Sequence, residues 1–236
     1  MAGFRAVPAG DAAVLLEFGS EIDEEVNEEA QRLAQALLAV PPEGVYGVVP
    51  AYTTVLIEYN PLITSSDAVV DHANSLTQLD ANLPSRRFLV PTCYGGDFGP
   101  DLAEVAERLR LSPARVVERH AGQDFRIFCL GFSPGFPLCG ILPDDLETPR
   151  RPTPRPKVPA GSVGLAGRQT GVYPATSPGG WQLIGRTPVP LFDVHKDPPV
   201  VFRPGDSLRF VPITDTEYRR LESAAACGDL TLEEDR

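Results

Sequence analysis

The sequence has few cysteines, and no two of them lie close together. Cys93, Cys129, Cys139 and Cys227 form no C-x-x-C pair, which excludes the usual zinc and disulfide-framework patterns. Isolated cysteines of this kind are typical of reduced structural thiols, so we expect a cytoplasmic protein. No run of about 18 apolar residues occurs, and Met1 leads into no apolar segment with a cleavage site. We therefore expect neither a membrane span nor a signal peptide.

Basic residues are scarce in the first third of the chain. Arg5 and Arg32 are the only two among residues 1–84, against 13 acidic residues, whereas residues 85–236 contain 19 of each sign. The whole net charge of −11 therefore comes from the first third. Such acidity argues against nucleic-acid binding, which requires a basic footprint. A solvated acidic helix face is its simplest explanation.

Familiar complete catalytic motifs are also missing. The chain has no HExxH, no Walker phosphate loop and no GxSxG, and His72 and His195 have no metal-ligand spacing. We expect no metal site, and no complete ATP site or hydrolytic triad within this chain alone.

Residues 1–84 show the pattern of an α+β domain. Strands are predicted at 13–18, 45–49 and 53–59, and a further one at 86–91 follows directly after this region. One helix is expected from an N-cap at Ser20 to Pro41, and a second runs from Ser66 to about Asp80. The order β-α-β-β-α-β matches a ferredoxin-like unit. The strand at 86–91 could instead belong to the next domain, and Pro84 is the expected hinge.

Residues 85–236 predict a different architecture. Two short helices are expected at 100–120, the second capped by Ser112, and a last helix at 214–226. From Phe125 onward, prolines and glycines interrupt short apolar runs, which favours a β-barrel with long loops. The tail 233–236 is expected to fray.

The segment 131–190 carries a local positive charge. Five arginines and one lysine lie between residues 145 and 190, against Asp145 and Glu147. Arginine forks match phosphate and carboxylate geometry, and proline- and glycine-rich loops can present main-chain N–H groups to an anion. The pattern indicates an anion site, or else barrel turns whose arginines pair with surface acids.

Several polar and aromatic residues of this region have two interpretations. Ser162, Gln169, Thr170 and Tyr173 suit the orientation of a small ligand, but also turn capping or buried hydroxyl bonds. His120 could complement a helix dipole. Trp181, the only tryptophan, favours a core position.

The order of short motifs in the second region resembles one known family, called KipI, allophanate hydrolase subunit 1 or the B-type 5-oxoprolinase subunit. The pieces are Gly99-Pro100-Asp101-Leu102, His120, Gly131-Phe132-Ser133-Pro134-Gly135-Phe136, Pro149-Arg150-Arg151, Pro154-Arg155, Val158-Pro159-Ala160-Gly161-Ser162-Val163, Gln169-Thr170-Gly171, Tyr173-Pro174 and Pro178-Gly179-Gly180-Trp181 through Thr187. The chain departs from the pattern at Leu138-Cys139, where the family tends to have Tyr-Leu, and at Arg168, where glycine is commoner.

The resemblance implies an α+β chain in which a ferredoxin-like domain (1–84) precedes a cyclophilin-like β-barrel (85–236). It implies a subunit of an ATP-dependent 5-oxoprolinase, active only in a complex with a second cyclophilin-like subunit (allophanate hydrolase subunit 2 type) and a third oxoprolinase subunit. ATP with Mg²⁺ would act at the level of the complex on a small amide. Under this hypothesis His120 and Arg155 are catalytic, with His120 carrying a proton. Lys157, Ser162, Gln169, Thr170, Tyr173 and Arg186 bind the substrate or nucleotide.

Three alternatives stay open at this level. A KipI-type member binds and inhibits a sensor histidine kinase, and a subunit labelled allophanate hydrolase would act on another small amide. A peptidyl-prolyl isomerase follows only from analogy of fold, which is weak evidence for function.

Overall fold

The computed structural model describes residues 3–77, 85–230 and 232–235. The chain divides into two compact units, Met1–Pro84 and Ser85–Arg236. We describe each unit by itself. No helix among the described residues is long and apolar enough to cross a membrane.

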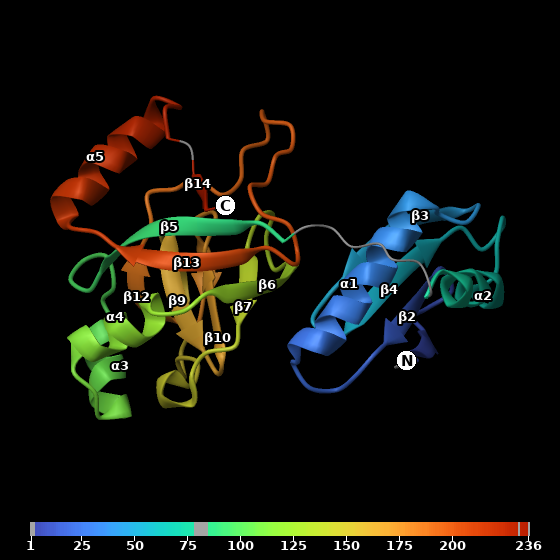
Figure 1. The fold of residues 1–236 in the computed structure, drawn as a ribbon, viewed down its shortest axis with the longest axis horizontal. Coiled ribbons are helices and arrows are strands. Elements are labelled where there is room, and N and C mark those ends of the chain that lie inside the picture. Colours follow the sequence, from blue (N-terminus) through green and yellow to red (C-terminus); the bar gives the residue numbers. More distant parts are fainter. Residues whose placement is uncertain (1–2, 78–84, 231, 236) are drawn as a thin grey trace. The chain divides into compact units, whose positions relative to one another are not determined.

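The first unit is an antiparallel sheet with two helices on one of its faces (Figure 1). Its strands lie in the order β1-β2-β4-β3. Their bounds are β1 Arg5–Pro8, β2 Ala13–Glu17, β3 Val45–Pro50 and β4 Thr54–Tyr59, and the helices are α1 Glu24–Ala39 and α2 Ser66–Leu76. Alternate residues such as Val55 and Ile57 point from the sheet into the core beneath these helices.

Two details of this unit correct the sequence prediction. The strand expected at 86–91 is β5 of the second unit, which is the alternative that the sequence left open, and β1, which was not predicted, pairs with β2 at the edge of this sheet. Helix α1 also begins later than expected, because the side chain of Asp23, not Ser20, accepts from the backbone N–H of Val26. The part of the second helix expected beyond Thr77 lies outside the described residues.

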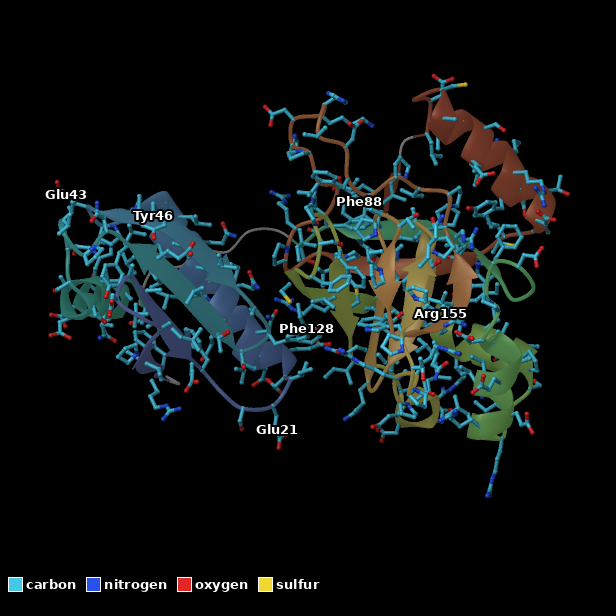
Figure 2. All side chains as sticks on the ribbon, turned by 180° about the vertical axis from the view of Figure 1, so that it is seen from behind. Glu21, Glu43, Tyr46, Phe88, Phe128 and Arg155 are labelled. Carbon is cyan, nitrogen blue, oxygen red and sulfur yellow. The ribbon has the colours of Figure 1, made fainter. Side chains whose placement is uncertain are left out.

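Acidic residues around α1 lie at the surface of this unit. Glu21 and Glu43, which Figure 2 labels, are exposed before and after α1, and Glu24 and Glu25 of its first turn are exposed too. Carboxylates at a helix N-terminus are stabilised by the helix dipole. The acidic excess therefore needs no ligand to explain it.

The second unit is built on a closed β-barrel of seven strands. The strands follow the order β12-β9-β10-β7-β6-β13-β5, and β12 pairs with β5 to close the ring. Their bounds are β5 Arg87–Tyr94, β6 Phe125–Leu130, β7 Pro137–Gly140, β9 Ser162–Ala166, β10 Gln169–Val172, β12 Gln182–Arg186 and β13 Ser207–Pro212. The expected barrel is thus present, and it supports a cyclophilin-like fold.

Helices and a separate two-stranded ribbon surround the barrel. The helices are α3 Leu102–Leu109, α4 Pro113–Ala121 and α5 Asp215–Ala226, with a short 3₁₀ helix η1 at Asp144–Leu146. The ribbon pairs β8, Arg155–Val158, with β11, Ser177–Gly179. Ser112 caps α4 as expected, through its hydroxyl and the backbone N–H of Arg115.

The described part of the tail, Glu233–Asp235, does not fray as expected, and Arg236 lies outside the described residues. Glu233–Asp235 forms strand β14, which adds to the edge of β5, and the carboxylate of Asp235 pairs with Arg87. Backbone pairing and this ion pair hold the tail despite its polar composition.

Three of the four cysteines have the burial expected of structural thiols. Cys93, Cys129 and Cys139 are buried, Cys227 is exposed, and all four are free. Burial raises the pKa of Cys129 to about 12. A thiol held protonated in this way is a poor nucleophile.

Candidate functional site: an arginine cluster on the outer barrel wall

The strands β9, β10 and β12 form a barrel wall whose two sides differ in chemistry. Side chains alternate along a strand, so Val163 and Leu165 point into the main barrel core, whereas Ala166 lies in a second hydrophobic cluster with Leu183 and Trp181. We call the first side the interior and the second side the outer face. Ser162 shares the outer face with Ala166, because the two lie four positions apart along β9.

The ribbon of β8 and β11 packs on this outer face. Val158 of β8 belongs to the same cluster as Leu183 and Trp181. Arg155, at the start of β8, pairs with Gly179 of β11. Figure 2 labels Arg155 on the barrel unit, above helices α3 and α4 as drawn. The predicted anion-binding arginines therefore lie above an apolar floor.

One buried carboxylate holds two of the arginines. Asp101 is 3% exposed and stands at the N-cap position of α3, but its side chain does not cap that helix. Instead it accepts from Arg155 Nη2 at 2.5 Å, from Arg151 Nη1 at 3.2 Å and from the backbone N–H of Leu183 at 2.7 Å. Two guanidinium groups against one carboxylate leave a local excess of one positive charge.

Several donors on the outer face have no acceptor in the protein. Among the described residues, Arg155 Nη1, Arg151 Nε and Arg186 Nε are buried atoms without a hydrogen-bond partner, and so is Ser162 Oγ. Leaving a buried donor unpaired costs about 1–3 kcal/mol. A guanidinium group can only donate, and its best acceptors are carboxylate and phosphate oxygens. The donor set therefore fits an anion and does not fit a cation.

The two arginines on Asp101 can be reached from solvent. Their side chains are 29% exposed for Arg151 and 23% for Arg155. Lys157, two residues along β8, is exposed, and a β-bulge between Arg155 and Val158 interrupts the strand alternation there. The cluster thus combines desolvated donors with a path for an anion to approach.

Arg186 contacts the loop of residues 95–101 that connects β5 to α3. Arg155 meets this loop at Asp101, whereas Arg186 Nη2 reaches the carbonyl oxygen of Asp97 at 3.5 Å. Ser162 is the cross-strand partner of Arg186, so their two unpaired groups lie on neighbouring residues. Tyr218 of α5 lies beside them: burial raises its pKa, and the Arg186 guanidinium acts in the opposite direction.

An aromatic cluster forms the floor of the outer face. The rings of Phe136 and Tyr173 meet edge to face at 4.9 Å, and Trp181 packs against both. Phe132 stacks on this cluster and remains 69% exposed. A Cβ at Gly179 would lie 2.3 Å from the Tyr173 hydroxyl, so only glycine permits this close approach.

Tyr173 connects the aromatic cluster to the cations. Burial raises the pKa of its phenol, while a hydrogen bond with the backbone of Trp181 and the guanidinium groups of Arg150 and Arg155 act in the opposite direction. Trp181 is buried as predicted. The sequence-predicted residues that share the outer face are Arg155, Ser162, Tyr173 and Arg186, and Lys157 is an exposed residue of the ribbon strand β8. Gln169 of β10, half-buried, lies on this side by alternation with Thr170.

His120 and Thr170 lie on the opposite side of the wall. His120 is fully buried against the rings of Phe125 and Phe210. Its Nδ1 lies 2.8 Å from the hydroxyl of Tyr94, and its Nε2 lies 2.8 Å from Thr170 Oγ1. The structure therefore does not bring His120 together with Arg155.

The hydrogen bonds around His120 form one consistent chain. The Thr170 hydroxyl donates to the carbonyl oxygen of Gly164 at 3.2 Å, so its oxygen accepts from His120 Nε2–H. Nδ1 is then the acceptor for the Tyr94 hydroxyl. Every group in the chain is satisfied only when His120 is neutral, and burial lowers the pKa of His120 to about 3.

The sequence prediction gave no role to Asp101 or Arg151. Both stand in quoted motifs, Gly99-Pro100-Asp101-Leu102 and Pro149-Arg150-Arg151. Pairing between residues 50 or 54 positions apart cannot be read from one sequence. Among the described residues, no group of three or more His, Cys, Asp or Glu side chains could hold a metal ion.

Comparisons with known proteins agree with this architecture. Residues 4–202 match the family described as "Carboxyltransferase domain, subdomain C and D". The chain is 39% identical to the B-type 5-oxoprolinase subunit of Bacillus subtilis, covering 89% of this chain and 92% of that protein. It is 45% identical to the protein of the same name from Escherichia coli O157:H7, covering 88% and 95%.

Solved structures show the same fold. TTHA0988 superposes with a TM-score of 0.78 at 40% identity over 86% of this chain, which spans only 40% of that protein. The urea amidolyase of K. lactis gives a TM-score of 0.80 at 20% identity, over 98% of this chain and 16% of that protein. At that identity the likeness concerns fold alone. The matched residues and the full-length relatives together show that the chain belongs to the family of B-type 5-oxoprolinase subunits, within the carboxyltransferase subdomain C and D proteins.

Proposed function

We propose that this chain is a subunit of an ATP-dependent 5-oxoprolinase and that its outer face binds an anionic group of the reaction. The observation that carries the proposal is the set of buried guanidinium N–H groups without an acceptor, beside Asp101. The names of the full-length relatives supply the reaction. The substrate, 5-oxoproline, is a small lactam with one carboxylate.

The chemistry requires stabilisation of negative charge. An unstrained lactam resists water, and ATP activates it by transferring a phosphoryl group to the amide oxygen. Water then opens the ring, releasing glutamate, ADP and phosphate. Fixed guanidinium groups in a partly desolvated site stabilise such charge better than water does. Arg155, Lys157 and Arg186 would hold the substrate carboxylate or the transferred phosphoryl group, and Ser162 would donate a hydrogen bond to it.

The remaining predicted residues take different roles in this proposal. Tyr173 supports the arginines from below, through its packing with Phe136 and Trp181. His120 and Thr170 hold the barrel interior together, because both ring nitrogens of His120 already have partners. Gln169 borders the outer face, where its amide would orient the lactam.

The remaining parts of the proposed enzyme are its partner subunits and ATP. We propose that activity requires a second cyclophilin-like subunit and a third subunit, because the relatives' names describe one lettered subunit of a larger enzyme. ATP would bind as its Mg²⁺ complex, with Mg²⁺ bridged by the phosphates. For the N-terminal unit we propose a variant of the ferredoxin-like fold in which β1 replaces the usual fourth strand.

The test measures ADP release from MgATP and 5-oxoproline, first with this chain alone and then with its partner subunits. Activity is expected only in the mixture. Arg155→Gln should lower kcat/KM about 100-fold, the size expected for a lost charge-stabilising donor. Arg168→Gln is the matched control, because Arg168 is exposed and pairs with the exposed Asp144. It should keep wild-type activity.

The kinetic constants separate the two anions. A rise confined to the KM for 5-oxoproline would assign Arg155 to the substrate carboxylate, and a fall in kcat would assign it to the phosphoryl group. Full activity of Arg155→Gln in the assembled complex would refute the site.

A further inference from the structure

The loop that carries Asp101 is fixed to strand β12. Asp101 and Leu183 exchange two hydrogen bonds: the Asp101 N–H donates to the Leu183 carbonyl oxygen at 2.9 Å, and the Leu183 N–H donates to the Asp101 carboxylate at 2.7 Å. Gly99 lies so close to β12 that a Cβ would be 2.0 Å from the Ile184 carbonyl oxygen. The carboxylate therefore has a defined position before any ligand binds.

The arginine side chains lack such an anchor of their own. The backbone of Arg151 is held by Gly180 at 2.7 Å, and that of Arg155 by its pairing with Gly179. Beyond the backbone, an arginine side chain has many rotamers and loses this freedom when it is fixed. Asp101 is the group through which both guanidinium groups are oriented.

A second buried aspartate in the same unit shows what a purely structural pair looks like. Asp206 is 2% exposed and accepts from Arg86 Nη2 at 2.5 Å and from the backbone N–H of Arg203 at 2.8 Å. It faces one arginine, and Arg86 has no buried N–H atom left without a partner in the described structure. One arginine with all its buried donors paired is therefore enough to hold a buried carboxylate, unlike the two arginines with unpaired donors at Asp101.

We infer that Asp101 is a positioning residue that holds Arg155 and Arg151 with their unpaired N–H groups directed at the substrate anion. The inference rests on the proposed function and adds Asp101 to the site as a residue that acts through Arg155 and Arg151. Asp101 itself does not touch the substrate, because its oxygens are occupied by Leu183, Arg151 and Arg155.

The substitution Asp101→Asn removes the negative charge and keeps the size and shape of the side chain. Asparagine keeps one oxygen that can accept from the Leu183 N–H, but its NH₂ group faces guanidinium donors and cannot accept from them. In the assembled complex we expect kcat/KM for 5-oxoproline to fall about 10- to 100-fold, the range found when a supporting partner of a binding group is lost. Asp206→Asn is the matched control, and it should lower the melting temperature without changing kcat/KM.

A double-mutant cycle distinguishes positioning from general support of the fold. If Asp101 acts through Arg155, adding Asp101→Asn to Arg155→Gln should lower kcat/KM by less than about threefold, because coupled residues are not additive. Independent, multiplied losses would overturn the inference. Wild-type kcat/KM for Asp101→Asn, with Arg155→Gln impaired, would also overturn it while leaving the proposed function intact.

A second variant keeps the inference testable if Asp101→Asn does not fold. Asp101→Glu keeps the charge and moves it by one methylene, and its loss should likewise disappear in the Arg155→Gln background. If Arg155→Gln itself has full activity, the proposed function fails, and the inference fails with it.

Discussion

Both sides of the barrel wall contain buried polar groups, but their hydrogen-bonding states are opposite. On the interior, Tyr94, His120 and Thr170 form a chain that ends on a backbone oxygen and leaves no member unpaired. On the outer face, Arg151 and Arg155 share one carboxylate and retain buried donors without acceptors. The difference teaches that burial of a titratable group alone does not mark a ligand site. A buried donor that has no acceptor and lies beside an accessible surface is the better indication of a ligand site.

The interior chain also shows how a histidine loses its usual chemistry. Proton transfer needs a pKa near the working pH, and burial lowers the pKa of His120 to about 3. The comparison therefore indicates a structural role for the interior and supports the anion binding proposed for the outer face.

The largest expected effect on activity comes from Gly99→Ala, which disturbs the loop that supports the outer face. The new Cβ would lie 2.0 Å from the Ile184 carbonyl oxygen, so the loop with Asp101 must leave β12. We expect a loss of about 3 kcal/mol in the free energy of unfolding and a loss of kcat/KM above about 100-fold. Urea unfolding of the chain and ADP release from the complex measure the two effects.

Gly131→Ala is the control for this substitution, because a Cβ there would make only an ordinary contact of 3.7 Å with Leu138. Equal behaviour of the two alanine variants would show that the close approach at Gly99 is unimportant.

The next effect concerns stability against pH and sharpens the account of the interior. His120 has a pKa of about 3 when folded, against 6.5 for an unperturbed histidine. Between these values the unfolded chain binds the proton and the folded chain does not. The His120 contribution to stability should therefore fall as the pH drops from 6.5 towards 3, by about 1.4 kcal/mol per pH unit.

The check is the unfolding free energy of wild type minus that of His120→Gln across this range, which cancels the titration of the carboxylates. His195→Gln provides the control, because His195 is exposed. A difference independent of pH would show that His120 titrates normally in the folded state.

The smallest effect is expected from Tyr94→Phe. It removes the donor to His120 Nδ1 and leaves that nitrogen buried without a partner, which should destabilise the chain by about 1–3 kcal/mol. kcat/KM of the assembled complex should stay within about threefold of wild type. A large kinetic loss at unchanged stability would place the interior chain in the reaction.

Local sequence patterns predicted most of the fold. Buried Val69, Ala73 and Leu76 lie at helical spacing in α2, and the alternation along β4 matches its burial. The strand β1 was not predicted, because its four residues are mostly exposed and carry no clear hydrophobic alternation. The strand β14 was missed, because its polar residues carry no hydrophobic pattern, and it is held by pairing with β5.

The candidate site was only partly accessible to sequence reasoning. The positive charge of segment 145–190 pointed to Arg155 and Arg186, since composition records charge directly. It could not separate His120 from them, because the side of the barrel wall on which a residue lies depends on the closed barrel. It also could not supply Asp101, whose role arises from contacts with residues about 50 positions later.

The most direct test of the division between the two sides compares Arg155→Gln with His120→Gln in the assembled complex. Both kcat/KM for 5-oxoproline and the melting temperature of each variant would be measured. The account predicts that Arg155→Gln loses about 100-fold in kcat/KM with little change in melting temperature, whereas His120→Gln melts several degrees lower and keeps its kcat/KM. The reverse pattern, a folded but inactive His120→Gln beside a fully active Arg155→Gln, would contradict it.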